Sequence, residues 1–180
     1  MSCFPQPKIG QDVYIAPTCY VGGEVVLGDE CTLMHHVVVR GDIAPIRIGA
    51  RVNLQDGTIV HTKYGTPLDI GDDVGVGHRA IVHGRRVASR TLIGMGAIVL
   101  DDCEIGSRCL IAAGTVLSPG TIVPDDCVVM GIPGKIVRHV TEKDLAAIDH
   151  VVQSYLRIGR LCASGAFPNI TPHPANSHMA

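Results

Sequence analysis

The segment IGMGAIVLDDCEIGSRCLIAAGTVLSPGTIVPDDCV, residues 93–128, repeats one pattern every six residues. Each hexad begins with Ile, Val or Leu, and its fifth residue is Ala, Cys or Thr. An amphipathic helix has a period of 3.6 residues and a half-buried strand a period of two, so neither gives a period of six. Short strands joined by tight corners, three to a triangular coil, do give it, because the first residue of each hexad then fills the interior.

The same frame extends back to residue 9 and gives nineteen hexads, with three short insertions after the hexads that begin at 39, 60 and 82. Assigned in turn to three faces, the hexads begin at 9, 27, 48, 70, 93, 111 and 129 on the first, at 15, 33, 54, 76, 99 and 117 on the second, and at 21, 39, 60, 82, 105 and 123 on the third. All three insertions then leave from one corner. We therefore predict an all-β fold, a parallel β-helix of about six triangular coils formed by residues 1–140, followed by a C-terminal α-helix.

The composition suits many short strands. Among 180 residues there are 21 Gly, two Phe and no Trp, and Gly together with β-branched residues favours tight corners and strands. The formal net charge is −2 and there is no basic run, so we expect no nucleic acid partner. The first ten residues lack the features of a signal peptide, and no apolar run has the length of a membrane span. We expect a cytoplasmic protein with no membrane partner.

Five of the seven cysteines share one place in the repeat. They occupy the fifth position of their hexads: Cys19, Cys31, Cys103, Cys109 and Cys127. At a crowded corner, Cys serves as a small buried apolar residue, so we predict neither a disulfide framework nor a cysteine metal cluster. Cys3 and Cys162 lie outside the repeat and belong to no motif.

The period changes after residue 138. The segment TEKDLAAIDHVVQSYLRIGRL, residues 141–161, begins with a Thr-x-x-Asp capping pattern. Apolar residues then recur at helical spacing: Leu145, Ile148, Val152, Tyr155 and Leu156. We predict a helix over 141–162 that packs on the prism, and a flexible tail over 163–180, which is rich in Pro and polar residues.

Three histidines suggest a metal site. His61 and His83 each follow an inward residue on the third face of consecutive coils, so both point outward and stack about 4.8 Å apart. Tetrahedral zinc needs donor nitrogens roughly 3.3 Å apart, which such a pair reaches by converging. His78 lies on the second face, across a corner, and its side chain diverges from the pair. A cyclic homotrimer, in which the second face of one chain packs on the third face of the next, would complete three sites. Three imidazoles suit Zn2+, and Fe2+ and Co2+ also accept them.

Polar residues accompany these histidines. Arg40 lies in the column of His61 and His83, and Asp56 lies in the column of His78. Across the predicted interface, Arg40 would bridge to Asp56 and fix the register. Gln55, beside Asp56, would donate a hydrogen bond to a metal-bound hydroxide or accept one from it.

The elements VVRGD, IRIGARVNLQDGTIVH, GVGHRAIVHG and IGMGAIVLD together resemble the γ-class carbonic anhydrase family, whose members are left-handed parallel β-helix homotrimers. The resemblance spans about residues 9–140. It implies that His61 and His83 of one chain and His78 of the next bind zinc or iron. It also places Arg40, Asp42 and Asp56 in polar bridges at the interface, and Asn53 and Gln55 beside the metal.

Two segments refine the resemblance. The stretch YLRIGRLCAS is similar to a subgroup that includes the phenylacetate-degradation and carnitine-operon proteins, which implies that Tyr155 lines the active site. Where the founding member of the family carries an acidic loop and a Glu for proton transfer, this chain has TKYGTPLD and Ile43. We therefore do not expect the founding member's proton shuttle here.

Three functions follow as hypotheses. The first is reversible hydration of CO2 to bicarbonate by a metal-bound hydroxide at the subunit interfaces. The second is an acyl-CoA thioesterase or hexapeptide acyltransferase, since these enzymes share the β-helix; such acyltransferases generally use one loop histidine and a long loop over coenzyme A, whereas this chain has short insertions. The third is a metal-binding trimer without catalytic activity.

Overall fold

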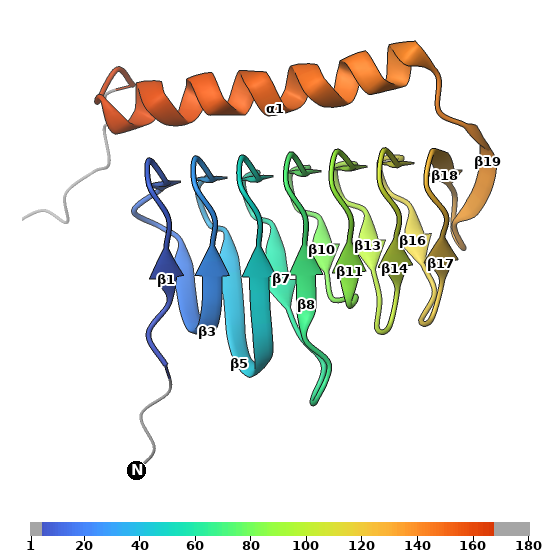
Figure 1. The fold of residues 1–180 in the computed structure, drawn as a ribbon, viewed down its shortest axis with the longest axis horizontal. Helices are drawn as coiled ribbons and strands as arrows, with labels where there is room; N and C mark the ends of the chain where they lie inside the picture. Colours follow the sequence, from blue (N-terminus) through green and yellow to red (C-terminus); the bar gives the residue numbers. More distant parts are fainter. Residues whose placement is uncertain (1–4, 168–180) are drawn as a thin grey trace, which may run out of the picture.

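The structure, a computed structural model, describes residues 5–167, which form a triangular β-helix and one long α-helix (Figure 1). Each face of the prism takes one short strand from every coil. All strand pairs are parallel except the last, in which β19 (Lys135–His139) pairs antiparallel with β18. The predicted parallel β-helix with a C-terminal helix is confirmed.

The three faces are named here by what lies on their outer side. The covered face consists of β2 (Tyr14–Ile15), β4 (Thr32–Leu33), β6 (Asn53–Leu54), β9 (Gly75–Val76), β12 (Leu92–Ile93), β15 (Leu110–Ile111) and β18 (Cys127–Met130). The apolar face consists of the first parts of β3 (Tyr20–Leu27) and β5 (Val38–Ile48), then β7 (Ile59–His61), β10 (Ile81–Val82), β13 (Ile98–Val99) and β16 (Val116–Leu117). The charged face consists of β1 (Lys8–Ile9), the second parts of β3 and β5, β8 (Leu68–Ile70), β11 (Arg86–Val87), β14 (Glu104–Ile105) and β17 (Ile122–Val123).

The β-helix has about seven coils, so the predicted number of six was too low. Val87 pairs with Ile70 in the coil before it and with Ile105 in the coil after it, and it is buried in the core. Residues 87–92 are therefore a hexad of their own, and the third predicted insertion does not exist. The corner after Val82 is instead one residue shorter than a full hexad.

This missed hexad also displaced the predicted faces. Ile93 pairs with Val76, and Val99 pairs with Val82. The predicted frame instead put Ile93 on the first face, with Ile70, and Val99 on the second face, with Val76. The assignments up to residue 82 are correct, and those from residue 93 onward are wrong by one face. The two remaining insertions do leave from one corner, between the apolar and the charged face.

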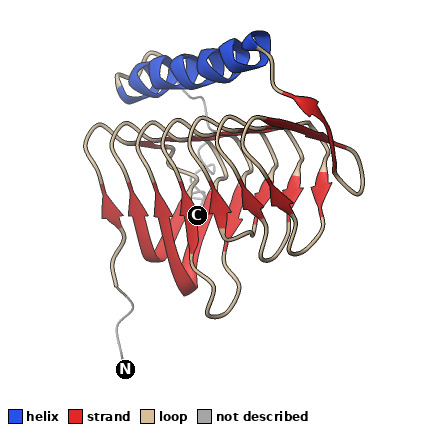
Figure 2. Cartoon of the chain, turned by 45° about the vertical axis from the view of Figure 1, so that its right-hand side comes forward, coloured by secondary structure: helices blue, strands red, loops and turns tan. Residues whose placement is uncertain are grey.

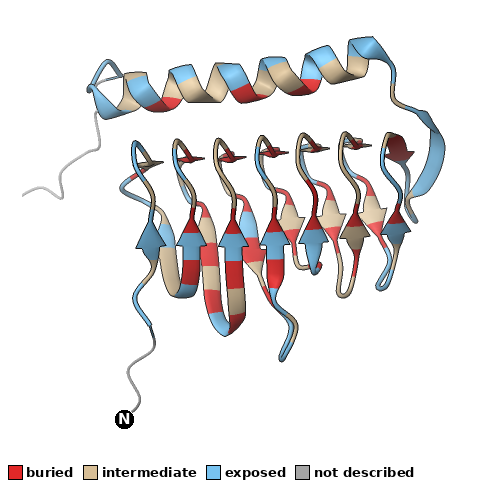
Figure 3. Cartoon of the chain, in the orientation of Figure 1, coloured by how far each residue is buried: buried red, intermediate tan, exposed pale blue. Residues whose placement is uncertain are grey.

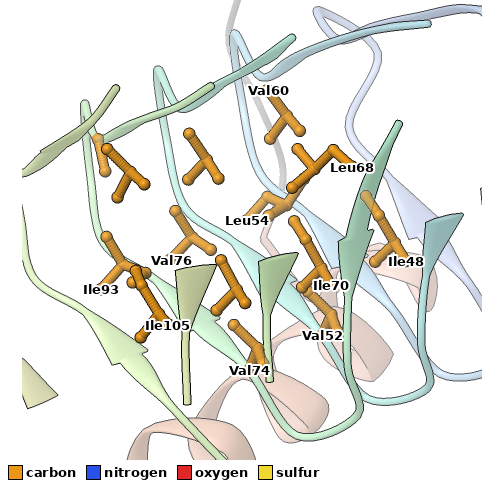
Figure 4. Packing of buried hydrophobic residues seen from close by; sticks show 14 of the residues in the cluster. Ile48, Val52, Leu54, Val60, Leu68, Ile70, Val74, Val76, Ile93 and Ile105 are labelled. Carbon is orange, nitrogen blue, oxygen red and sulfur yellow. The ribbon is translucent and has the colours of Figure 1, made fainter. Parts of the chain in front are cut away.

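The core of the β-helix is formed by three columns of inward-pointing side chains, one column from each face. The first residue of almost every hexad is Val, Ile or Leu and is buried (Figure 3), and Figure 4 shows Leu54, Val60, Ile70 and Val76 meeting inside the prism. Four of the five fifth-position cysteines are buried and the fifth, Cys19, is half-buried; all five are free thiols. The predicted burial of the corner cysteines is confirmed for Cys31, Cys103, Cys109 and Cys127, and Cys3 lies outside the described residues.

Helix α1 (Glu142–Ala163) lies along the covered face (Figures 1 and 2). It begins as predicted, with Thr141 as N-cap and Asp144 completing a capping box. Ile148 and Val152 are buried against the prism. At Gly159 the helix comes so close to β4 that an added Cβ would lie 2.5 Å from Oγ1 of Thr32. Of the predicted tail, residues 168–180 lie outside the described residues.

Two ion pairs join the helix to the corner between the charged and covered faces. The guanidinium of Arg90 donates to both carboxylate oxygens of Asp149, at 2.8 and 2.7 Å, and Arg160 donates to Glu30 at 2.7 Å. Arg90 and Glu30 occupy the left-handed backbone region, with φ of 57°. In residues 5–167 no helix has the length and apolarity needed to cross a membrane.

Candidate metal centre

His61 and His83 form a pair on the apolar face. His61 is the last residue of β7 and His83 directly follows β10, and the two strands are paired through Val60 and Val82. The ring centroids are 5.1 Å apart, and Nδ1 of His61 lies 3.1 Å from Nε2 of His83. The stacked pair that the sequence predicts is present in the chain.

A carboxylate holds each ring of this pair from the other side. Nε2 of His61 lies 3.1 Å from Asp42, and Nδ1 of His83 lies 2.7 Å from Asp101. A carboxylate only accepts hydrogen bonds, so each of these two nitrogens carries the ring proton. When both rings are neutral, the two nitrogens that face each other both carry lone pairs, and a proton or a metal ion between them makes the contact favourable. Their separation is close to the roughly 3.3 Å between two nitrogen ligands of tetrahedral zinc, so the pair fits such a metal.

His78 lies at the corner between the covered and apolar faces. Its Nδ1 is 3.1 Å from Asp56, and its Nε2 is 3.3 Å from the hydroxyl of Tyr155 on α1. Burial, and then the charge of Asp56, raise the pKa of Tyr155, so this hydroxyl keeps its proton near neutral pH. The structure thus brings together three residues that the sequence singled out, His78, Asp56 and Tyr155.

One chain does not bring His78 to the pair. Among residues 5–167, no three His, Cys, Asp or Glu side chains are grouped so as to hold a metal ion. His78 precedes the strands of the apolar face, whereas His61 and His83 lie where those strands end. Completion of the site by a second chain remains a prediction.

Asn53 and Gln55 lie next to each other on the covered face. The Gln55 amide donates to Oδ1 of Asn53 at 3.1 Å and accepts from the backbone N–H of His78 at 3.2 Å. Both side chains are buried, and within residues 5–167 no group accepts a hydrogen bond from Nδ2 of Asn53. Gln55 also borders a groove of about 340 Å³, whose other side chains, among them Leu92, Leu110 and Val151, are apolar. Asn53 therefore fixes the orientation of an amide that touches both His78 and this groove.

Arg40 pairs with Asp42 inside the chain. Although burial opposes it, the hydrogen bonds from Arg40 and His61 lower the pKa of Asp42, so this carboxylate stays ionised and accepts from both. Asp56, the predicted partner of Arg40 across an interface, contacts His78 of its own chain. The intersubunit bridge from Arg40 to Asp56 is not tested by a single chain.

The outward residues of the three faces differ in kind. On the charged face they are Lys8, Val26, Arg47, Asp69, Arg86, Glu104 and Ile122. On the apolar face they are Tyr20, Val38, Ile59, Ile81, Ile98 and Val116. Helix α1 packs on β2, β4, β6 and β9 of the covered face, and within residues 5–167 no helix packs on the apolar face. This bare apolar column lies between the corner that carries His78 and the pair of His61 and His83.

Comparison with known proteins gives the family. A model of the bacterial transferase hexapeptide repeat matches residues 6–41 and 86–119. A carbonic anhydrase of Geobacillus kaustophilus is 43% identical, over 86% of this chain and 85% of that protein. The chain belongs to the γ-class carbonic anhydrase-like family. The mitochondrial gamma carbonic anhydrase 2 of Arabidopsis thaliana is 33% identical over 88% of this chain and 59% of its own length.

Solved structures extend the comparison for this γ-class carbonic anhydrase-like chain. The crystal structure of a candidate acetyltransferase from Bacillus cereus matches this structure with a TM-score of 0.83. The two sequences are 36% identical, and the match covers 88% of this chain and 92% of the Bacillus cereus chain. The β-helix is therefore shared with a protein assigned to acyl transfer. Since one fold hosts several chemistries, the function has to be argued from the site.

One residue beside the histidine pair was missed in the sequence analysis, namely Asp101, which contacts His83. The predicted frame put the hexad that begins at Val99 on the second face, away from His83. Val99 in fact stacks on Val82, which sets Asp101 against His83. The signal in the sequence was the aliphatic residue Val87. If Val87 is counted as the first residue of a hexad, Val99 falls on the same face as Val82, and Asp101 comes next to His83.

Proposed function

We propose that this chain catalyses the reversible hydration of CO2 to bicarbonate as a homotrimer, with a divalent metal ion at each subunit interface. The observation that carries the proposal is the half-site of His61 and His83, whose facing nitrogens lie 3.1 Å apart, together with a third imidazole kept apart at the next corner. Names of relatives at 43% and 33% identity support the same activity.

The trimer is supported by the bare apolar face. Its outward column includes Tyr20 and Ile59, which are 55% and 41% exposed, and burying such a column against a neighbouring chain is favourable. Helix α1 occupies the covered face, so the covered face itself would not pack on the neighbouring chain as the sequence predicted. In a closed ring, one chain's apolar face would instead meet the next chain's corner between the covered and apolar faces, so that His78 of the next chain reaches the pair. Three equivalent sites result from three-fold symmetry.

His61 and His83 of one chain and His78 of the next would hold the ion. Zn2+ fits three neutral imidazoles and keeps a fourth position open; Fe2+ and Co2+ are alternatives. When bound, the metal supplies the Lewis acidity that makes water a nucleophile near neutral pH.

The chain's own residues would position the reactants. The Gln55 amide, fixed by Asn53, presents a donor for an oxygen of bicarbonate at the edge of an apolar groove that suits CO2. The hydroxyl of Tyr155 lines the same site beside His78. Asp42 and Arg40 hold His61 in place.

Stopped-flow measurement of CO2 hydration, on protein loaded with zinc and on protein treated with a chelator, tests the proposal. Loaded protein should be active, and both chelation and His83→Ala should abolish the activity. His150→Ala is the matched control, since His150 is exposed on α1 and contacts Ser154. Activity that survives removal of the metal would contradict the proposed chemistry.

Acyl transfer or thioester hydrolysis is the second candidate. The apolar groove of about 340 Å³ beside Gln55 and the likeness to the Bacillus cereus structure favour it. Release of free coenzyme A from acetyl-CoA, without CO2 hydration, would support this candidate. Tight metal binding with neither activity would support a metal-binding trimer without catalysis.

A further inference from the structure

Asp101 makes the shortest contact between a histidine of the site and a carboxylate. Asp101 lies two residues after the end of β13, and His83 directly follows β10. The two strands are paired, which brings the residues that follow them together. Its Oδ1 is 2.7 Å from Nδ1 of His83, whereas the contacts of Asp42 with His61 and of Asp56 with His78 are each 3.1 Å. The pairing of β10 with β13 sets the position of Asp101, so its contact with His83 lies within one chain and does not depend on a neighbouring subunit.

The contact decides which nitrogen of His83 binds a cation. The Asp101 carboxylate accepts a hydrogen bond from Nδ1–H, which leaves the lone pair on Nε2. Nε2 is the atom that faces His61. The same hydrogen bond limits rotation of the ring, because only one orientation keeps Nδ1 on Asp101 and Nε2 on His61.

We propose that Asp101 is a positioning residue of the metal centre, which holds His83 in the Nδ1–H tautomer with Nε2 directed at the ion. The proposal rests on the proposed metal site. Carboxylates that orient a metal-binding histidine contribute about 10- to 100-fold to metal affinity. Asp101 should contribute within that range.

Asp102 provides a matched control. It is the next residue, but it pairs with Lys63 at 2.7 Å rather than with a histidine. Asp102 has φ of 59°, in the left-handed region, which Asn tolerates well. Asp102→Asn removes the same charge one residue away and leaves the contact of His83 intact.

The experiment compares zinc affinity and histidine tautomers in full-length wild-type, Asp101→Asn, Asp101→Ala and Asp102→Asn proteins. Competition with a chromophoric chelator should give about 10- to 100-fold weaker binding for the two Asp101 variants and an unchanged affinity for Asp102→Asn. Nitrogen-15 NMR of the metal-free proteins should show the Nδ1–H tautomer of His83 in wild type and in Asp102→Asn, and a loss of that tautomer in Asp101→Ala.

A merely structural role would lower the temperature of unfolding in the Asp101 variants and leave both readouts as in wild type, which would overturn the inference. Both readouts are independent of catalysis. A wild-type protein that binds zinc and does not hydrate CO2 would contradict the proposed function alone. A wild-type protein that binds no zinc would contradict the metal site, and the tautomer of His83 would still decide whether Asp101 positions the ring.

Discussion

Nδ1 of His61 and Nε2 of His83 face each other across 3.1 Å, although the two residues are 22 positions apart in the chain. One coil of the β-helix separates them, so the spacing of strands sets the spacing of the imidazoles. Asp42 and Asp101 hold the outer nitrogens of the two rings. The chain therefore carries a histidine pair whose geometry the backbone repeat determines.

The apolar face should be the surface that forms the trimer. Ile59→Asp puts a charge in the middle of its outward column, and burying that charge at an interface would be unfavourable. We expect sedimentation velocity to show monomers for this variant. Ile122→Asp is the control, because Ile122 is 70% exposed on the charged face. A trimer that persists in Ile59→Asp would show that the chains meet elsewhere.

The Arg90–Asp149 pair should make the docking of α1 sensitive to acid. The hydrogen bonds from Arg90 lower the pKa of Asp149, so in acid the folded chain binds fewer protons at this site than the unfolded chain does. The stabilisation is therefore present above the unfolded pKa of about 3.9 and is lost as the pH falls through the lower folded value.

Because the pair is about half exposed, Asp149→Asn should cost less than about 1 kcal/mol of unfolding free energy at pH 7. Urea unfolding at pH 7 and at pH 2.5 checks this, and the difference from wild type should shrink in acid. Ile148→Ala, which empties a buried position, should cost about 2–5 kcal/mol at either pH. An equal loss for Asp149→Asn at both pH values would contradict the role of the ion pair.

The corner cysteines should resist alkylation. Burial raises the pKa of Cys31 and of Cys109 to about 11, so at pH 8 few of these thiols are thiolates, the reactive form. Mass spectrometry after iodoacetamide treatment should find Cys31 and Cys109 unmodified in folded protein and modified in urea. Rapid labelling of either thiol in folded protein would show that the corners open.

Several features could be predicted because the repeat dictates them. The first residue of a hexad has to be apolar and inward, which fixes the outward direction of His61 and His83 and their stacking. The capping box at Thr141 and Asp144 and the apolar spacing through Ile148 and Val152 define α1 locally. These features depend on period and on neighbours in sequence, which a single sequence contains.

Other features depend on one ambiguous corner. The segment VHGRRVASRTL, residues 82–92, fits either a full hexad with five extra residues or a short corner followed by a second hexad. Only the pairing of Val87 with Ile70 decides between them. That choice sets the number of coils and the face of every later hexad, and with it the position of Asp101. The antiparallel strand β19 has no repeat at all, so the period could not predict it.

Mixing two defective chains tests the central claim, that His78 and the pair on one chain serve different metal ions. His78→Ala keeps the pair of His61 and His83, whereas the double variant His61→Ala/His83→Ala keeps only His78. Homotrimers of either should bind no metal tightly, since at most two imidazoles meet at each site.

In a mixed trimer, whichever chain is present twice, one interface joins an intact pair to an intact His78. After co-refolding, isolated mixed trimers analysed by elemental mass spectrometry should therefore contain about one tightly bound zinc ion each, by the ligand count of a tetrahedral site. If all three ligands came from a single chain, mixing would restore no site, and the zinc content would stay at the level of the two parents.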